Sequence, residues 1–294
     1  MAVLELPVQA NPFDVNYSVT LVKPIIANTC TKAWLQAIRH LSNCDSWRDY
    51  TLVLEISEPM RLPPEDRAVY DIVDSFLAEK TTIRISTVIN TIFPATLFAR
   101  YGADGVFEHY PRLWPKIKKH ARCQHWGTYA DRIIRGKSKS DVSGPLKDLI
   151  EKMQKQLATG AHKRAAYELG TLDFVTDIAV HDPSADSSRI MGGPCLSHLS
   201  FKLTGDRRLM LTALYRSHYY IHRALGNLYG LAWLQFFVAR ELSIETAELV
   251  CHSTMATLDT LSANANTGVK GWGVTNVKAL LAECNDAINS GVNV

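Results

Sequence analysis

The feature that most constrains the fold is a succession of strands and one long apolar helix in the C-terminal half. Pro194–Leu203 and Leu209–Ser217 alternate apolar and polar side chains, and Gly205-Asp206 between them is a hairpin turn signal. Gly226–Glu241 is apolar around most of its circumference, which predicts a buried helix. Ala247–Leu258 follows as another strand. Strands interleaved with a buried helix predict a layered α/β or α+β fold.

The rest of the chain adds elements of both kinds. Gly136–Pro145 is a polar linker, which we interpret as a surface loop within one domain rather than as a domain boundary. The other expected elements are a helix over Thr31–Leu41 with Thr31 as its N-cap, a strand over Thr51–Ile56, a helix from Pro63 to about Ala78, a strand and turn over Thr81–Ile92, short helices within 94–136, a helix over Leu146–Leu157, a strand over Asp173–Val180, and a closing helix over Asn276–Asn289.

Composition narrows the classes of protein to consider. Of 294 residues, 47% are hydrophobic and 21% charged, which is typical of a globular chain. The formal net charge of +3 argues against a nucleic-acid partner. No apolar run reaches the roughly 18–20 residues of a membrane span, and the N-terminus does not resemble a signal peptide. Six scattered cysteines without a CxxC pair indicate a reducing, cytoplasmic location.

Several common site motifs are missing. The sequence has no GxGxxG, GxxxxGK[ST] or GxSxG segment, which disfavours dinucleotide enzymes, P-loop NTPases and serine hydrolases. His120, Cys123 and His125 form a group of metal-ligand residue types, but no second pair accompanies them, so we expect no metal site there. The basic run Lys116–Arg122 fits a solvated helix face better than a phosphate-binding surface.

Cys195 is the strongest candidate for chemistry. It stands at the start of the first hairpin strand, and Arg216-Ser217 ends the second strand 21 residues later. A hairpin about Gly205-Asp206 would put the thiol and the guanidinium side by side, an arrangement that lowers a thiol pKa. Asn227 comes ten residues after Ser217, and its amide can both donate and accept, as a pyrimidine edge requires. A lone buried cysteine can instead serve as a small apolar residue, but the joint pattern favours function.

This pattern resembles a known family. The segments PCLSHLSFKL and LYRSHYYIHRALGNLYGLA are similar to the core of thymidylate synthases and pyrimidine hydroxymethylases. The likeness covers about residues 172–258, while the divergent N-terminal half, 1–145, resembles the family only loosely, through WGTYADRI at Trp126–Ile133. It implies one thymidylate synthase-like domain over 1–294, with a mixed sheet, flanking helices and a homodimer with its sheets back to back.

The resemblance also implies roles for individual residues. Cys195 would be the nucleophile that adds to C6 of a pyrimidine nucleotide, Arg216 and Ser217 would hold the phosphate, and Asn227 would contact the base. 5,10-Methylenetetrahydrofolate would donate a one-carbon unit to C5, giving a methyl or a hydroxymethyl product. Tyr219 occupies the position of a folate-contacting aspartate.

Departures from the family pattern leave an alternative open. Leu196 follows the cysteine where the family has His, and His222-Arg223 replaces a Leu-Gly step. Leu169–Leu172 stands where the family has an arginine pair, and the sugar-binding His-x-Tyr is missing from Ala247–Asp259. The alternative is a catalytically divergent nucleotide-binding or scaffold homologue on the same fold.

Overall fold

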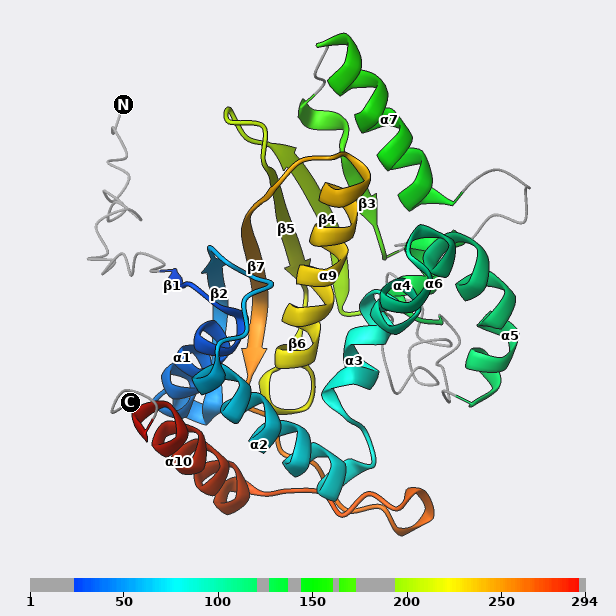
Figure 1. Ribbon diagram of the computed structural model, residues 1–294. Coiled ribbons are helices and arrows are strands. Elements are labelled where there is room, and N and C mark those ends of the chain that lie inside the picture. Colours follow the sequence, from blue (N-terminus) through cyan, green and yellow to red (C-terminus); the bar gives the residue numbers. More distant parts are fainter. Residues whose placement is uncertain (1–23, 121–126, 137–143, 161–163, 173–193, 291–294) are drawn as a thin grey trace, which may run out of the picture.

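The computed structural model describes residues 24–120, 127–136, 144–160, 164–172 and 194–290 (Figure 1). The strand expected at Asp173–Val180 lies outside these ranges. So do residues 137–143 of the polar linker and two members of the possible ligand group, Cys123 and His125.

A seven-stranded mixed sheet forms the centre of the described chain. Its order is β1-β2-β7-β5-β4-β3, and the short strand β6 pairs with β7. β2 runs antiparallel to β7, whereas β5 and β7 are parallel, so the sheet is mixed as expected. The strands are β1 (Ile25–Ala27), β2 (Arg48–Ile56), β3 (Glu168–Gly170), β4 (Leu196–Leu203), β5 (Leu209–Tyr215), β6 (His218–Tyr219) and β7 (Thr246–Thr257).

Flanking helices complete the α/β fold predicted from the sequence. Figure 1 shows α9 crossing the sheet in front of β7, β5 and β4, with α2 and α10 side by side below it. The helices are α1 (Cys30–Ser42), α2 (Pro64–Thr81), α3 (Ile85–Ile92), α4 (Ala95–Tyr101), α5 (Tyr110–His120), α6 (Tyr129–Ile134), α7 (Pro145–Thr159), α9 (Leu225–Glu241) and α10 (Val274–Ser290), with π-helical turns η2 (Gly105–His109) and η4 (Tyr220–Ala224) and 3₁₀ turns η1 (Asp45–Trp47), η3 (Arg164–Ala166) and η5 (Ala265–Thr267).

The sheet has one buried and one half-exposed face. Along β5, Leu209, Leu211, Ala213 and Tyr215 are fully buried on the side of α9. The residues between them are half-buried, as are their neighbours on the adjacent strands, and this alternation follows the period of two of a strand. The hydrophobic core therefore lies between the sheet and the helices of the α9 side.

The prediction for Thr81–Ile92 was wrong, because the structure has helix α3 there instead of a strand. The β-branched composition suggested a strand, but Ile85, Val88, Ile89 and Ile92 are buried at helical spacing. Tertiary packing decides the outcome, since α3 crosses α9 over glycines. A Cβ added at Gly230 would lie 2.7 Å from the Ile92 Cβ.

The N-cap of the first helix also needs correction. Thr29 caps α1, because its side-chain oxygen accepts a hydrogen bond from the Lys32 N–H at 3.2 Å, and Thr31 lies within the helix. The Thr31 hydroxyl is instead paired with the Tyr229 hydroxyl of α9 at 2.8 Å. The local sequence does not show which of two threonines separated by one residue is the cap, whereas the contact with α9 assigns Thr31 to the helix.

None of the helices in the described ranges is long and apolar enough to cross a membrane.

Candidate functional site

The β4–β5 hairpin places Cys195 next to Arg216. The two strands pair antiparallel, with Leu196 opposite Tyr215. Just beyond this pair the Arg216 N–H donates to the Cys195 carbonyl at 2.9 Å, and the Arg216 Nε donates to the Pro194 carbonyl at 3.0 Å. The juxtaposition predicted from the hairpin is therefore present, and the guanidinium is held against the chain that carries the thiol.

Tyr129 fixes the backbone at Cys195 from another element. Its hydroxyl, at the start of α6, accepts hydrogen bonds from the Cys195 N–H at 3.0 Å and from the Leu196 N–H at 3.2 Å. Burial raises the pKa of Tyr129 to about 12, so the hydroxyl keeps its proton at neutral pH. Tyr129 was not predicted as a site residue, although it belongs to the WGTYADRI segment that carried the weak N-terminal resemblance.

Arg223 is the second cation of the site, and it was not predicted. It lies on η4, is partly buried, and acts electrostatically on Cys195, Tyr129 and Asp259. Burial lowers the pKa of its guanidinium. Within the described ranges no hydrogen bond or ion pair connects this guanidinium to an acceptor. Its position in the sequence stood out only as a departure from a Leu-Gly step.

The pKa of Cys195 corrects one expectation. We expected the neighbouring guanidinium to lower it, but burial of the half-buried thiol outweighs the arginines and raises the pKa above its ordinary value. Arg216 and then Arg223 act in the lowering direction. In the unliganded protein Cys195 is therefore a protonated thiol at neutral pH, with two cations placed to stabilise the thiolate once it forms.

Asp259 supports the turn that carries Arg223. Its Oδ1 accepts hydrogen bonds from the Ile221 N–H at 2.8 Å and from the His222 N–H at 3.4 Å. Its own carbonyl accepts from the Trp272 indole N–H at 2.7 Å. Burial raises the pKa of Asp259 to about 6, and the backbone donors and Arg223 oppose that shift. Asp259 therefore holds η4 in place and is a carboxyl group that titrates near neutral pH.

Asn227 belongs to a buried chain of polar side chains beneath this turn. Its Nδ2 donates to His218 Nε2 at 3.0 Å, His218 Nδ1 is 3.0 Å from the Ser253 Oγ, and that oxygen is 3.2 Å from the Tyr220 hydroxyl. Burial lowers the pKa of His218 to about 3, so the ring is neutral. With Nε2 as acceptor, Nδ1 carries the proton and donates to Ser253.

The chain of hydrogen bonds connects to the cysteine strand through an aromatic stack. The rings of Tyr215 and His218 lie parallel, with centroids 4.0 Å apart and an interplanar angle of 4°. Tyr215 is paired with Leu196, the residue after the cysteine. Asn227 uses one N–H on His218, and its Oδ1 has no partner in the described part of the chain. The amide therefore retains an acceptor and one donor.

Ser217 and Tyr219 are the two remaining predicted site residues. Ser217 follows Arg216 in the turn between β5 and β6 and is half-buried. Tyr219 is 48% exposed on β6, where its backbone pairs with Thr257 of β7. Tyr219 therefore presents its ring at the solvent edge and does not take part in the buried network.

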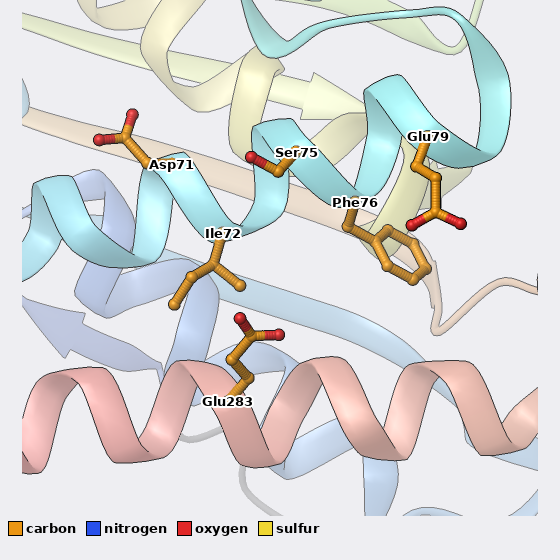
Figure 2. Close-up of a pocket in the computed structure, with 6 residues that line it drawn as sticks. All are labelled: Asp71, Ile72, Ser75, Phe76, Glu79 and Glu283. Atoms are coloured by element: carbon orange, nitrogen blue, oxygen red, sulfur yellow. The ribbon is translucent and has the colours of Figure 1, made fainter.

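A separate groove of about 430 Å³ lies between α2 and α10. In Figure 2, Ile72 extends from α2 towards α10, and Glu283 extends from α10 towards α2. Asp71 and Glu79 on its rim are already paired with Arg67 and Lys80 at 3.0 Å. The lining includes none of the residues discussed above, so we do not assign this groove to the candidate site.

Comparisons with known proteins found a similar structure but no matching sequence. No family model matches the chain, and no curated protein matches it either. Among solved structures, it is similar to the thermostable thymidylate synthase A from Bacillus subtilis, with a TM-score of 0.47 and 11% sequence identity. The match covers 87% of this chain and 84% of that one.

Proposed function

We propose that this protein transfers a one-carbon unit to C5 of a pyrimidine nucleotide through a covalent adduct at Cys195. The observation that carries the proposal is the placement of a half-buried thiol beside two guanidiniums, those of Arg216 and Arg223. Tyr129 fixes the adjoining backbone with two hydrogen bonds. A thiol of this kind can be converted to a nucleophile when a substrate is bound, because the cations stabilise the anionic sulfur.

The covalent step uses the residues of the site as follows. Cys195 loses its proton and its sulfur forms a bond to C6, so that the electron pair of the C5–C6 double bond moves to C5 and the adjacent C4 carbonyl. C5 would then bond to the one-carbon unit as the bonds from that unit to the donor's nitrogens break, their electron pairs staying on nitrogen, and C5 would lose its own proton to water. Hydride from the reduced folate, or water, would then add to the exocyclic carbon and return an electron pair to the ring. Expulsion of Cys195 restores the C5–C6 double bond in the product. Arg223 is the cation placed to balance negative charge that develops near the sulfur.

The residue types near the site fit a folate donor. A pteridine needs a ring to stack on and an acceptor for its amino groups. Tyr219 offers an exposed ring, and Asp259 offers a carboxylate beside η4. 5,10-Methylenetetrahydrofolate supplies the one-carbon unit when bound, with hydride leading to a methyl product and water to a hydroxymethyl product. The choice between these two products stays open.

Arg216, Ser217 and Asn227 would bind the nucleotide. A guanidinium and an adjacent hydroxyl are suited to a phosphate. The acceptor and donor that Asn227 retains match the N3–H and C4 carbonyl of a uracil-type base. Asn227→Asp should shift preference towards cytosine, with a change in relative affinity of about 1–3 kcal/mol. Calorimetry with matched uracil and cytosine nucleotides measures this change, and an unaltered preference would remove Asn227 from base recognition.

One observation favours the alternative of a non-catalytic nucleotide-binding or scaffold protein. Burial raises the pKa of Cys195 despite both arginines, so the unliganded site holds little thiolate. In that alternative Arg216 and Asn227 still bind a nucleotide, but no bond to sulfur forms.

A mechanism-based nucleotide separates the two functions. The protein is incubated with a 5-fluoropyrimidine nucleotide and methylenetetrahydrofolate, and intact mass is measured. Fluorine at C5 cannot leave as a cation, so the adduct at Cys195 persists. We expect the adduct in the native chain and in Cys44→Ala, which loses another partly exposed thiol, but not in Cys195→Ala. Equal nucleotide binding by the native chain and Cys195→Ala without any adduct would support the binding protein instead.

A homodimer is part of the proposal. The sheet face opposite α9 carries half-buried Val53, Leu214 and Val250 on neighbouring strands, and a second copy packed against it would bury them. Leu214→Lys should reduce the mass measured by analytical ultracentrifugation to that of one chain. Lys278→Glu on α10 is the control, and a monomeric native protein would refute the dimer.

A further inference from the structure

A second cluster of reactive side chains lies where α1 leads into β2. His40 is in the last turn of α1, and Cys44 lies four residues after His40, just beyond the end of the helix. Asp49 is the second residue of β2. The Cys44 Sγ lies 3.5 Å and the Asp49 Oδ2 lies 2.5 Å from the same atom, His40 Nε2. The three potential ligand atoms are all within 4.8 Å of one another.

The cluster is supported by well-packed elements. Leu41, next to His40, is fully buried in the core, and its carbonyl accepts from the Cys44 N–H at 3.2 Å. Asp49 is paired with Ala256 in the β2–β7 ladder. The Tyr50 N–H donates to Asp49 Oδ1 at 2.7 Å, which turns Oδ2 towards the imidazole. Backbone contacts rather than chance rotamers therefore bring the groups together.

The geometry does not suit a nucleophile relay. A Cys-His-Asp relay uses both ring nitrogens, one facing the thiol and the other facing the carboxylate. Here the thiol and the carboxylate converge on Nε2, which has a single in-plane direction for either a proton or a lone pair. The Cys44 Sγ also donates to the His40 carbonyl at 3.4 Å, whereas a cation at the centre would take all three ligand atoms at once.

We propose that His40, Cys44 and Asp49 form a zinc site on the surface of this protein. Imidazole, thiolate and carboxylate are all zinc ligands, and three of them leave a fourth tetrahedral position for water. The sulfur excludes Mg²⁺ and Ca²⁺, which prefer oxygen ligands. One thiolate and one carboxylate neutralise the charge of the ion. Because the ligands come from α1, the following turn and β2, bound zinc would clamp the helix to strand β2.

Cobalt(II) is the probe that tests the site directly, since it replaces zinc and gives a charge-transfer absorption band when a thiolate is bound. We expect the native chain to bind about one equivalent of Co²⁺ with this band, and Zn²⁺ to displace it. Cys44→Ser should abolish the band, whereas Cys195→Ala should retain it. His40→Gln and Asp49→Asn should each weaken Co²⁺ binding by at least about tenfold, as expected for the loss of a ligand.

Thermal unfolding provides the control for folding. The three ligand side chains are at least partly exposed, so the metal-free variants should unfold at about the native temperature. Zn²⁺ should raise the unfolding temperature of the native chain but not that of Cys44→Ser. The site is refuted if the native chain shows no thiolate band, if the band survives in Cys44→Ser, or if His40→Gln and Asp49→Asn both bind Co²⁺ with native affinity. In those cases His40 and Asp49 are a hydrogen-bonded surface pair beside a thiol.

Discussion

Replacing Tyr129 with phenylalanine tests how the cysteine strand is held. The substitution keeps the ring in the core and removes the oxygen that accepts from the Cys195 and Leu196 N–H groups at 3.0 and 3.2 Å. A net contribution of about 0.5–1.5 kcal/mol is typical of one such bond, and a buried donor left without a partner costs about 1–3 kcal/mol.

The two donors differ in their access to water, and this sets the expected magnitude. Leu196 is fully buried, so its N–H stays unpaired in Tyr129→Phe, whereas half-buried Cys195 can recruit solvent. The unpaired Leu196 N–H and the Cys195 hydrogen bond that solvent replaces together predict a loss of about 2–4 kcal/mol in the free energy of unfolding. Urea unfolding with linear extrapolation measures this loss.

Tyr110→Phe is the matched control for that measurement. Tyr110 is also a buried tyrosine, but its hydroxyl pairs with the Thr128 hydroxyl at 3.0 Å, and that hydroxyl can rotate to another partner. We expect a smaller loss, of about 0.5–1.5 kcal/mol. If Tyr129→Phe is no less stable than Tyr110→Phe, then the Tyr129 hydroxyl does not hold the strand and the reasoning is wrong.

Three further predictions follow from the packing and the charges. Gly230→Ala should destabilise the fold by about 1–3 kcal/mol in urea unfolding, since the added Cβ meets Ile92 at 2.7 Å. Asp259→Asn should become more stable relative to the native chain as pH rises from about 4 to 6, by up to about 3 kcal/mol, because a folded pKa raised to about 6 means that ionising Asp259 opposes folding. Arg223→Gln should slow alkylation of Cys195 at neutral pH, since removing a cation raises the thiol pKa further.

Control variants in the same chain accompany the first and third of these predictions, and the pH dependence itself checks the second. Gly205→Ala places a Cβ in open space and should leave stability nearly unchanged. If Asp259→Asn loses stability relative to the native chain, or shows no relative change, as pH rises from about 4 to 6, the raised pKa is contradicted. Arg100→Gln removes an exposed cation of α4 and should not alter alkylation of Cys195. Equal alkylation rates in Arg223→Gln and Arg100→Gln would show that Arg223 does not act on the thiol.

Local sequence patterns predicted much of the fold. The hairpin at Gly205-Asp206 is present, with a turn closed by the Thr204 N–H on the Arg208 carbonyl at 3.0 Å. The buried helix expected over Gly226–Glu241 is α9, Leu225–Glu241. Both signals are local patterns within one short segment, so they can be recognised without knowledge of the rest of the chain. The proximity of Cys195 and Arg216 follows from the same hairpin.

Tertiary structure decided what depends on residues far apart in sequence. Residues 85–92 form a helix because glycines of α9, about 140 positions later in the chain, allow this helix to pack close against α9. The cation Arg223 and the hydroxyl of Tyr129 reach Cys195 from different elements, so no spacing along the chain revealed them. The pKa of Cys195 rises because burial by the whole surrounding structure outweighs the neighbouring charges. A sequence shows which charges can lie near a thiol, but the solvent exposure that sets their effect exists only in the folded chain.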